Sequence, residues 1–192
     1  MRAPKKILQQ SEKILRAKAL EVPLTLIKTN KIKKILTEMK TALAREEDGV
    51  AIAAPQIGHS LRIFVLSDKI FTKDFAKNRK SLNRNNIIGA NSEPVGNIKE
   101  NSEEYVFINP KISKFSREKQ WMPEGCLSVR WLYGKTLRST KILLSAYDET
   151  GKKFTRGASG LLAQIFQHET DHLNGILFID HAKDIKEELP KK

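Results

Sequence analysis

The stretch "QHETDHLNG", residues 167–175, contains two histidines four positions apart, with a glutamate directly after the first. On a helix, His168 and His172 lie one turn apart on the same face, where two imidazoles can bind one metal ion. Glu169, next to the first histidine, is placed to act as the acid/base of a metal-dependent hydrolase. The alternative is a buried helix whose histidines only satisfy hydrogen bonds of the core. The motif therefore indicates a metal site whose third ligand lies elsewhere in the chain.

The residues around this motif predict a helix over 159–174 at the centre of the molecule. Ser159 is a candidate N-cap, and Gly175 stands just past the end of the helix. Apolar residues lie on several sides of this helix and continue directly after it, so strands must pack around it. We therefore expect an α+β fold, with antiparallel β-sheets packed around a central helix carrying the HExxH motif.

The rest of the chain shows further helix and strand patterns and one long polar stretch. Hydrophobic periodicity and turn residues predict a helix over 30–47, strands over 61–66 and 105–110, where Pro110 would end the strand, and a hairpin over 141–154. Residues 67–104 are rich in Lys, Asn and Ser with Gly and Pro breakers, which is typical of a long loop or insertion. We expect residues 1–192 to form a single catalytic domain with 67–104 as a loop insertion.

The composition is that of an ordinary globular domain, with 192 residues of which 40% are hydrophobic and 30% charged. No apolar run approaches the ~18 residues of a membrane span, and the N-terminus lacks the apolar core of a signal peptide. The single cysteine, Cys126, excludes an internal disulfide framework and fits a reducing cytosol. We expect a cytoplasmic protein without a membrane partner. An organellar location stays open in case a transit peptide has been removed.

The formal net charge of +13 raises the question of a nucleic-acid partner. The basic residues are scattered along the chain, without an aromatic-interleaved basic motif or a glycine-rich phosphate loop. This pattern favours a solvated basic surface over a specific nucleic-acid site. A weak, transient attraction to a polyanionic assembly such as the ribosome stays open, and we expect the protein to be a monomer.

The third ligand separates the classes of metallohydrolase. A metzincin needs a histidine where this chain has Phe178, and a thermolysin-like enzyme needs a glutamate from a later helix, for which too few residues follow Asp180. The remaining candidate is Cys126 in "PEGCLSV" (123–129), where Gly125 precedes it in a turn and a strand-like tail follows. A thiolate with two imidazoles suits Zn²⁺ or Fe²⁺ and leaves one position open for water.

Three stretches, "GVAIAAPQIG" (49–58), "EGCLS" (124–128) and "QHETDHLNG" (167–175), resemble the three signature motifs of the peptide deformylase family, in the same order. The resemblance covers most of the chain outside 67–104. It implies removal of the N-terminal formyl group from the formylmethionine of newly synthesised polypeptides, with N-formylmethionyl nascent peptides as partners. It also implies one divalent metal ion per chain, Fe²⁺ physiologically, with Zn²⁺, Ni²⁺ or Co²⁺ able to replace it.

The reaction needs an oxyanion site and an apolar pocket beside the metal. By resemblance to the family, the Gln56 side-chain amide and the backbone N–H of Leu127 stabilise the oxyanion. Leu161 and Ile165 precede His168 by seven and three residues and therefore share its helix face. Plain core packing is the alternative for each pocket residue. The expected pocket for the methionine side chain is formed by Val50, Ala51, Leu161 and Ile165.

Three residues depart from the usual pattern of the family. Ala51 stands where a second glycine is usual, Arg130 where a proline follows "EGCLSV", and Gln164 where the helix is usually apolar. These departures bear on substrate preference and leave the ligands and the acid/base in place. Two other functions stay open. The missing third protease ligand disfavours a metallopeptidase that cuts internal peptide bonds, and the intact Cys-His-His set with Glu169 disfavours a binding protein without turnover.

Overall fold

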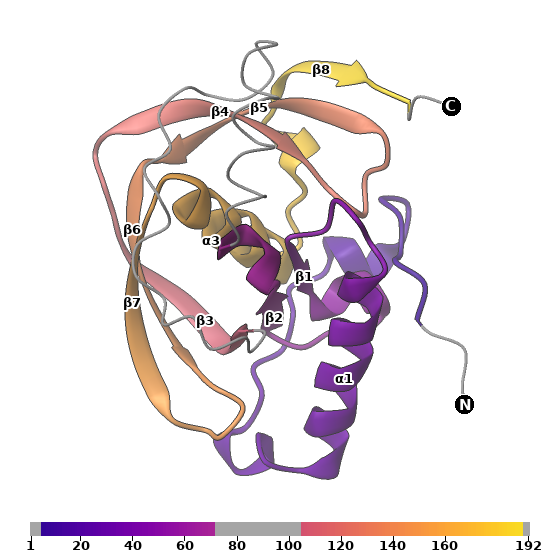
Figure 1. Ribbon diagram of the computed structural model, residues 1–192, viewed down its shortest axis with the longest axis vertical. Helices are drawn as coiled ribbons and strands as arrows, with labels where there is room; N and C mark the ends of the chain where they lie inside the picture. Colours follow the sequence, from indigo (N-terminus) through magenta and orange to yellow (C-terminus); the bar gives the residue numbers. More distant parts are fainter. Residues whose placement is uncertain (1–4, 72–104, 190–192) are drawn as a thin grey trace.

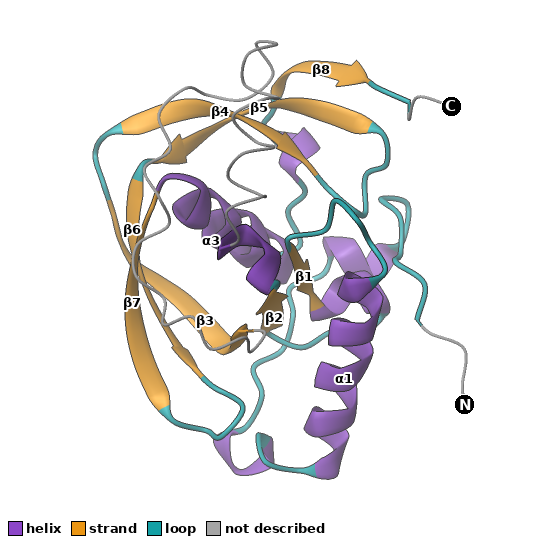
Figure 2. Cartoon of the chain, viewed as in Figure 1, coloured by secondary structure: helices purple, strands orange, loops and turns teal. Residues whose placement is uncertain are grey.

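The computed structural model describes residues 5–71 and 105–189, in which helix α3 (Gly160–Leu173) lies between two antiparallel sheets (Figures 1 and 2). The larger sheet has the strand order β1-β2-β3-β6-β7 and the smaller one β4-β5-β8. This arrangement confirms the predicted α+β fold around a central helix. The strands are β1 (Ala51–Ala53), β2 (Ile63–Leu66), β3 (Tyr105–Phe115), β4 (Lys119–Gly125), β5 (Leu132–Ser139), β6 (Lys141–Tyr147), β7 (Lys153–Ser159) and β8 (Lys183–Glu187).

Helix α3 begins directly where β7 ends, as the sequence predicted to within one residue. Ser159 occupies the N-cap position with extended backbone, although its side chain makes no capping hydrogen bond. The helix ends at Leu173, and Gly175 follows with a φ of 76°. A Cβ at Gly175 would lie 2.6 Å from the carbonyl oxygen of Arg16. Glycine is required there because both the left-handed backbone and the close approach of the N-terminal segment exclude a side chain.

Aromatic rings join α3 to the middle of the larger sheet. Phe64 of β2 and Phe107 of β3 stack with ring centroids 4.4 Å apart. Phe166 of α3 meets Phe107 edge-on at 4.9 Å. All three side chains are almost completely buried. Because buried aromatic pairs combine a large apolar area with directional contacts, this cluster fixes how the motif helix sits on the sheet.

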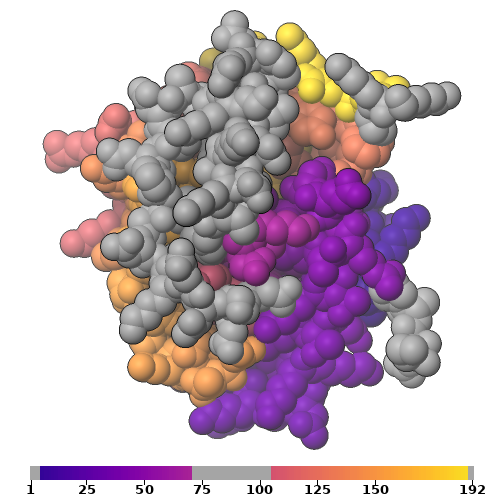
Figure 3. All heavy atoms as spheres, in the orientation of Figure 1, coloured from indigo at the N-terminus to yellow at the C-terminus, as the bar shows by residue number. Residues whose placement is uncertain are grey.

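Helix α1 (Asn30–Ala44) confirms the predicted helix, although it is shorter at its C-terminal end. Its apolar face packs against β1 and the 3-10 helix η3 (Ala54–Ile57). In the space-filling view of Figure 3, this N-terminal part of the chain, in purple, forms the lower right of the face shown. The other 3-10 helices are η1 (Lys13–Arg16), η2 (Leu24–Leu26), η4 (Asp68–Phe71) and η5 (Phe178–Asp180).

Two strand boundaries differ from those predicted. Strand β3 continues past Pro110, because its pairing with β6 shifts register between Ile108 and Lys111. Asn109 has a φ of 51°, and this irregularity accommodates a residue without an N–H. The sequence predicted a strand-like segment after Cys126. In the structure, strand β4 ends just before Cys126 and a turn follows it. The predicted position of Cys126 in a turn is nevertheless correct.

The predicted insertion begins after β2. Its first residues form η4, and the remainder, 72–104, lies outside the described residues. The predicted hairpin over 141–154 corresponds to β6 and β7. Among the described residues, no helix has the length and apolar character needed to cross a membrane.

Candidate active site

The three candidate ligands lie together beside a pocket between α3 and the turn after β4. Cys126 is contributed by the turn, whereas His168 and His172 lie one turn apart on α3. The candidate ligand atoms of these residues all lie within 4.8 Å of one another, and Cys126 Sγ is 3.1 Å from His172 Nε2. Over residues 5–71 and 105–189, no other group of His, Cys, Asp or Glu side chains meets in this way. One thiolate and two imidazoles fit a divalent ion that keeps one open position.

Glu169 is buried beside these ligands. Only 4% of the residue is exposed, and its Oε2 has no hydrogen-bond partner in the described part of the chain. Burial raises the pKa of Glu169 to about 7, although the charge of His168 acts in the opposite direction. A carboxyl group with a pKa near neutrality can both take up and release a proton. An unpartnered buried carboxylate oxygen on the residue that follows His168 also fits a site built to hold a metal ion and its water.

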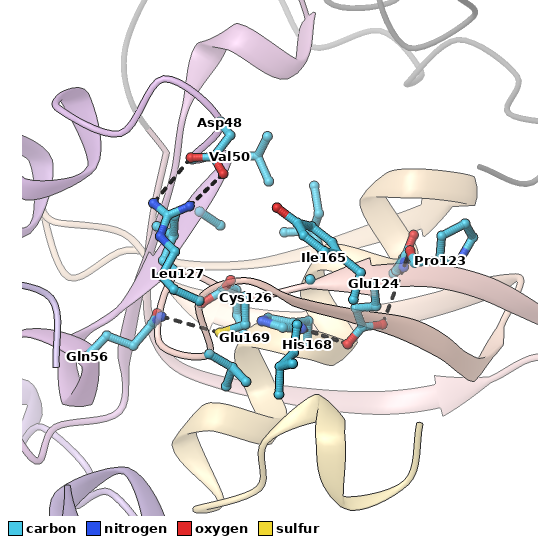
Figure 4. Close-up of a pocket in the computed structure, with 18 of the residues that line it drawn as sticks. Asp48, Val50, Gln56, Pro123, Glu124, Cys126, Leu127, Ile165, His168 and Glu169 are labelled. Atoms are coloured by element: carbon cyan, nitrogen blue, oxygen red, sulfur yellow. Dashed lines mark hydrogen bonds and ion pairs between the residues drawn. The ribbon is translucent and has the colours of Figure 1, made fainter. Parts of the chain in front are cut away.

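Gln56 and Leu127 lie on the cysteine side of the site. Gln56 Oε1 accepts a hydrogen bond from the backbone N–H of Ala53 at 2.7 Å, and Gln56 Nε2 donates to Ser128 Oγ at 3.0 Å. The same nitrogen is 3.8 Å from Cys126 Sγ. The backbone N–H of Leu127 meets no acceptor among the described residues. Figure 4 shows Gln56 and Cys126 on one side of His168, with Glu124 on the other.

A pocket of about 370 Å³ opens beside the candidate ligands. Its lining includes His168 and Glu169 and is mainly apolar. All four residues predicted for the methionine side chain line this pocket: Val50, Ala51, Leu161 and Ile165. Positions 161, 165 and 168 follow the helical repeat, so that one face of α3 carries both the apolar wall and a ligand. These four residues also belong to, or pack against, a hydrophobic core cluster, so their role toward the substrate stays a prediction.

A buried ion-pair network lies behind His168, and the sequence analysis did not identify the roles of Glu124 and Arg138 in it. Glu124 Oε1 accepts a hydrogen bond from His168 Nδ1 at 2.6 Å and from Arg138 Nη2 at 2.6 Å. Arg138 Nε donates to Glu124 Oε2 at 3.0 Å, and its other nitrogen pairs with Asp171 of α3. Burial acts to raise the pKa of Glu124, but the attraction of His168 and Arg138 outweighs it and holds that pKa well below its usual range. Glu124 is therefore an ionised carboxylate that orients the His168 ring.

A second arginine cluster lies at the other side of the pocket. Arg130 donates to Asp48 at 2.7 Å and also pairs with Glu46, which lies more than 80 positions earlier in the chain. Its guanidinium also lies 5.1 Å from the ring centroid of Trp131. Arg130, Asp48 and Trp131 all line the pocket. Arg130, the residue that follows "EGCLSV", therefore links the turn after β4 to the segment before β1.

Comparisons with known proteins agree with this geometry. The model of the polypeptide deformylase family matches residues 4–188. A peptide deformylase of Psychrobacter cryohalolentis is 33% identical over 159 residues, which cover 83% of this chain and 70% of the relative. Peptide deformylase 2 of Clostridium acetobutylicum is 34% identical over 178 residues, covering 93% of this chain and 95% of that protein.

Solved structures share the fold. The Met-Ala-Ser-bound crystal structure of a class I type b peptide deformylase from Acinetobacter baumannii has a TM-score of 0.72 and 28% sequence identity, covering 94% of this chain and 99% of that one. A plant peptide deformylase structure has a TM-score of 0.72 and 31% identity, covering 96% of this chain and 83% of that one.

Proposed function

This chain belongs to the polypeptide deformylase family, and on that premise we propose how its residues remove the formyl group from N-formylmethionyl peptides. The protein is a hydrolase of a metal-dependent family whose substrates are formylated nascent peptides. One observation carries the assignment to residues. Cys126, His168 and His172 lie together beside an apolar pocket, and Glu169, which follows His168 and lines the same pocket, has a buried, unpartnered carboxylate oxygen.

Cys126, His168 and His172 hold one divalent metal ion in this proposal. When bound, the ion stabilises the developing negative charge and lowers the pKa of a coordinated water. Fe²⁺ is the proposed physiological ion, and Zn²⁺, Ni²⁺ or Co²⁺ can replace it because the thiolate and imidazole donors suit all four. Glu124 supports the choice of ligand atom at His168, because its hydrogen bond to Nδ1 leaves Nε2 of that ring to face the ion.

Glu169 is the proposed acid/base. Its Oε2 takes the proton of the attacking water, and the same carboxyl group returns it to the departing amide nitrogen. The pKa of about 7, caused mainly by burial, suits both transfers at neutral pH. The neighbouring Glu124 cannot replace it, because that carboxylate is already occupied by Arg138 and His168.

Gln56 and Leu127 are the proposed oxyanion donors. Ala53 fixes the Gln56 amide by donating to its oxygen, which leaves the nitrogen on the side of Cys126. The N–H of Leu127 follows Cys126 directly and has no acceptor among the described residues. Two donors held before the substrate binds need no reorganisation during the reaction, which is the requirement for oxyanion stabilisation.

The methionine side chain of the substrate enters the pocket lined by Val50, Ala51, Leu161 and Ile165 in this proposal. A volume of about 370 Å³ accommodates a methionine with part of the following peptide. The A. baumannii relative, similar over 94% of this chain, was crystallised with Met-Ala-Ser, which has the form of a deformylation product.

The test is formate release from formyl-Met-Ala-Ser by the anaerobically purified protein, with metal content measured in parallel. Glu169→Gln should retain the metal and lose activity about 100-fold or more, because an amide cannot take up the proton. Cys126→Ala should lose metal and activity together. Glu187→Gln on the exposed β8 serves as the matched control and should behave like wild type. Near-normal activity of metal-replete Glu169→Gln would refute the proposed acid/base.

We also propose that residues 1–192 form one catalytic domain, with 67–104 inserted between β2 and β3. The supporting observation is that Leu66 and Tyr105 are direct antiparallel partners, so the two ends of the segment are ~5 Å apart. Replacing about half of 67–104 by a short Gly/Ser linker should therefore leave formate release largely intact. Complete loss of activity in a variant with an unchanged circular dichroism spectrum would show that the segment helps to build the site.

The proposed setting is the cytoplasm or an organelle. Relatives from bacteria match this chain, and so does a chloroplastic/mitochondrial peptide deformylase of Arabidopsis thaliana. We propose a monomer, because one chain supplies the ligands, the acid/base and the pocket. A weak, transient association with the ribosome is consistent with the formal charge of +13.

A further inference from the structure

Gln164 occupies a place in the pocket wall that the proposed mechanism does not use. It lies on α3 one residue before Ile165 and one turn before His168, and it lines the same pocket. The residue is 5% exposed, whereas a glutamine side chain is normally on the surface. A buried amide must have partners for its hydrogen-bonding groups, so the contacts of its two ends decide what it can do.

The orientation of the Gln164 amide follows from its neighbours. One of its terminal atoms lies 2.7 Å from the carbonyl oxygen of Pro123 and 3.3 Å from Glu124 Oε2. Both neighbours are acceptors, so the terminal atom facing them is the donor nitrogen, Nε2. The oxygen, Oε1, consequently faces away from this pair. No residue in the described part of the chain donates a hydrogen bond to Gln164 Oε1. This oxygen is also not fully buried.

The partners of Gln164 are themselves fixed, so the amide cannot rotate to exchange its two ends. Pro123 belongs to β4, which pairs with β5 along its whole length. Glu124 is held by Arg138 and by His168. A rotated amide would place its oxygen against two acceptors and lose both hydrogen bonds. Gln164 lines the mainly apolar pocket and its fixed oxygen is neither fully buried nor hydrogen-bonded to a described residue, so this acceptor is available to a ligand there.

We propose that Gln164 determines specificity for the first side chain of the substrate, by accepting a hydrogen bond from a side chain of methionine length that ends in a hydroxyl. An apolar pocket penalises such a hydroxyl because the group loses its water on entering. The Gln164 oxygen replaces that lost hydrogen bond. The same oxygen must give up its own water when a purely apolar side chain covers it, so Gln164 disfavours methionine and norleucine relative to an apolar wall. This inference rests on the proposed function.

The experiment compares two tripeptides that differ by one group. Formyl-norleucyl-Ala-Ser ends its first side chain in a methyl group, and formyl-(5-hydroxynorvalyl)-Ala-Ser has a hydroxyl in the same place. The measured quantity is the ratio of kcat/KM for the norleucine peptide to that for the hydroxyl peptide. Gln164→Leu should raise this ratio about tenfold, because the hydroxyl then has no partner. The change should lie in KM rather than kcat, because a hydrogen bond to the end of the side chain is made equally in the bound substrate and in the transition state.

Binding of the deformylated tripeptides, measured as competitive inhibition, provides a second readout and should change in the same direction. Gln167→Leu is the matched control, because Gln167 is another buried glutamine of α3 that bonds Ser139 and does not line the pocket. That variant should lose stability with an unchanged ratio. Gln164→Met replaces Gln164→Leu if the latter does not fold.

The outcomes separate the two proposals. If the wild-type protein does not hydrolyse formyl-Met-Ala-Ser, the proposed function is refuted. Normal hydrolysis with a ratio that is the same in Gln164→Leu or Gln164→Met would show that Gln164 has only a structural role. A wild-type protein that rejects the hydroxyl peptide more than about 100-fold would also overturn the inference, because an acceptor in reach should prevent so large a penalty.

Discussion

Two arginines lie near the pocket, each between two carboxylates, and they differ in burial: Arg130 lines the pocket, whereas Arg138 pairs with the lining residue Glu124. Arg138 pairs with Glu124 and Asp171, and the side chains of Arg138 and Glu124 are 6% and 4% exposed. Arg130 pairs with Glu46 and Asp48, whose side chains are 30% and 56% exposed. Figure 4 shows Asp48 and Glu124 on the two sides of the site. An arginine between two carboxylates thus occurs once in the interior and once near the surface.

The difference in burial decides what each cluster does. Removing a charge from a buried pair leaves the other charge without water or partner, which costs several kcal/mol. Exposed pairs contribute little, because water and salt screen them. The buried cluster also reaches the chemistry directly, since Glu124 accepts a hydrogen bond from His168. We therefore expect the Arg138 cluster to control stability and metal binding. The Arg130 cluster should connect two pocket segments and contribute little to the free energy of unfolding.

The largest effect is expected from Arg138→Met, which removes the buried cation and leaves Glu124 ionised without its main partner. The free energy of unfolding should fall by about 3–5 kcal/mol. Urea denaturation of the apoprotein measures this change without the contribution of a bound metal. The double variant Arg138→Met/Glu124→Met should recover a large part of the loss. A loss below about 1 kcal/mol in Arg138→Met would mean that burial does not distinguish the two clusters.

Glu124→Gln should have the next largest effect, and it should fall on metal binding. The amide retains the size of the carboxylate but not the charge that holds His168 in place. Substitutions of such partners reduce metal affinity about 10–100-fold. Competition with a chromogenic chelator measures the affinity, and Glu118→Gln in the turn before β4 provides an exposed control. Wild-type affinity in Glu124→Gln would contradict the orienting role.

The smallest effect is expected from Arg130→Ala. Because its partners are partly exposed, the loss in unfolding free energy should be about 0.5–1 kcal/mol. In 1 M NaCl this loss should shrink further, whereas the loss in Arg138→Met should change little. Metal content should stay at the wild-type level. An Arg130→Ala variant that loses metal, or a penalty that is independent of salt, would show that the outer cluster acts like the buried one.

Sequence patterns were sufficient for the elements whose signals are local. The spacing of His168 and His172 places them on one face of any helix, and the apolar residues around them indicate that the helix is buried. Cys126 was predicted as the third ligand by elimination, because the chain contains a single cysteine and the positions required by other metallohydrolases hold unsuitable residues. The pocket residues Leu161 and Ile165 followed from the same helical repeat.

The tertiary structure alone decided the features that depend on pairing between distant residues. In β5, Thr136 and Arg138 face inward while Leu137 is 44% exposed, which reverses the usual preference of apolar residues for the core. Arg138 can be buried only because Glu124, fourteen positions earlier, and Asp171, thirty-three positions later, neutralise it. Neither partner can be read from local periodicity, since the cost of desolvating a charge depends on which groups the fold brings beside it.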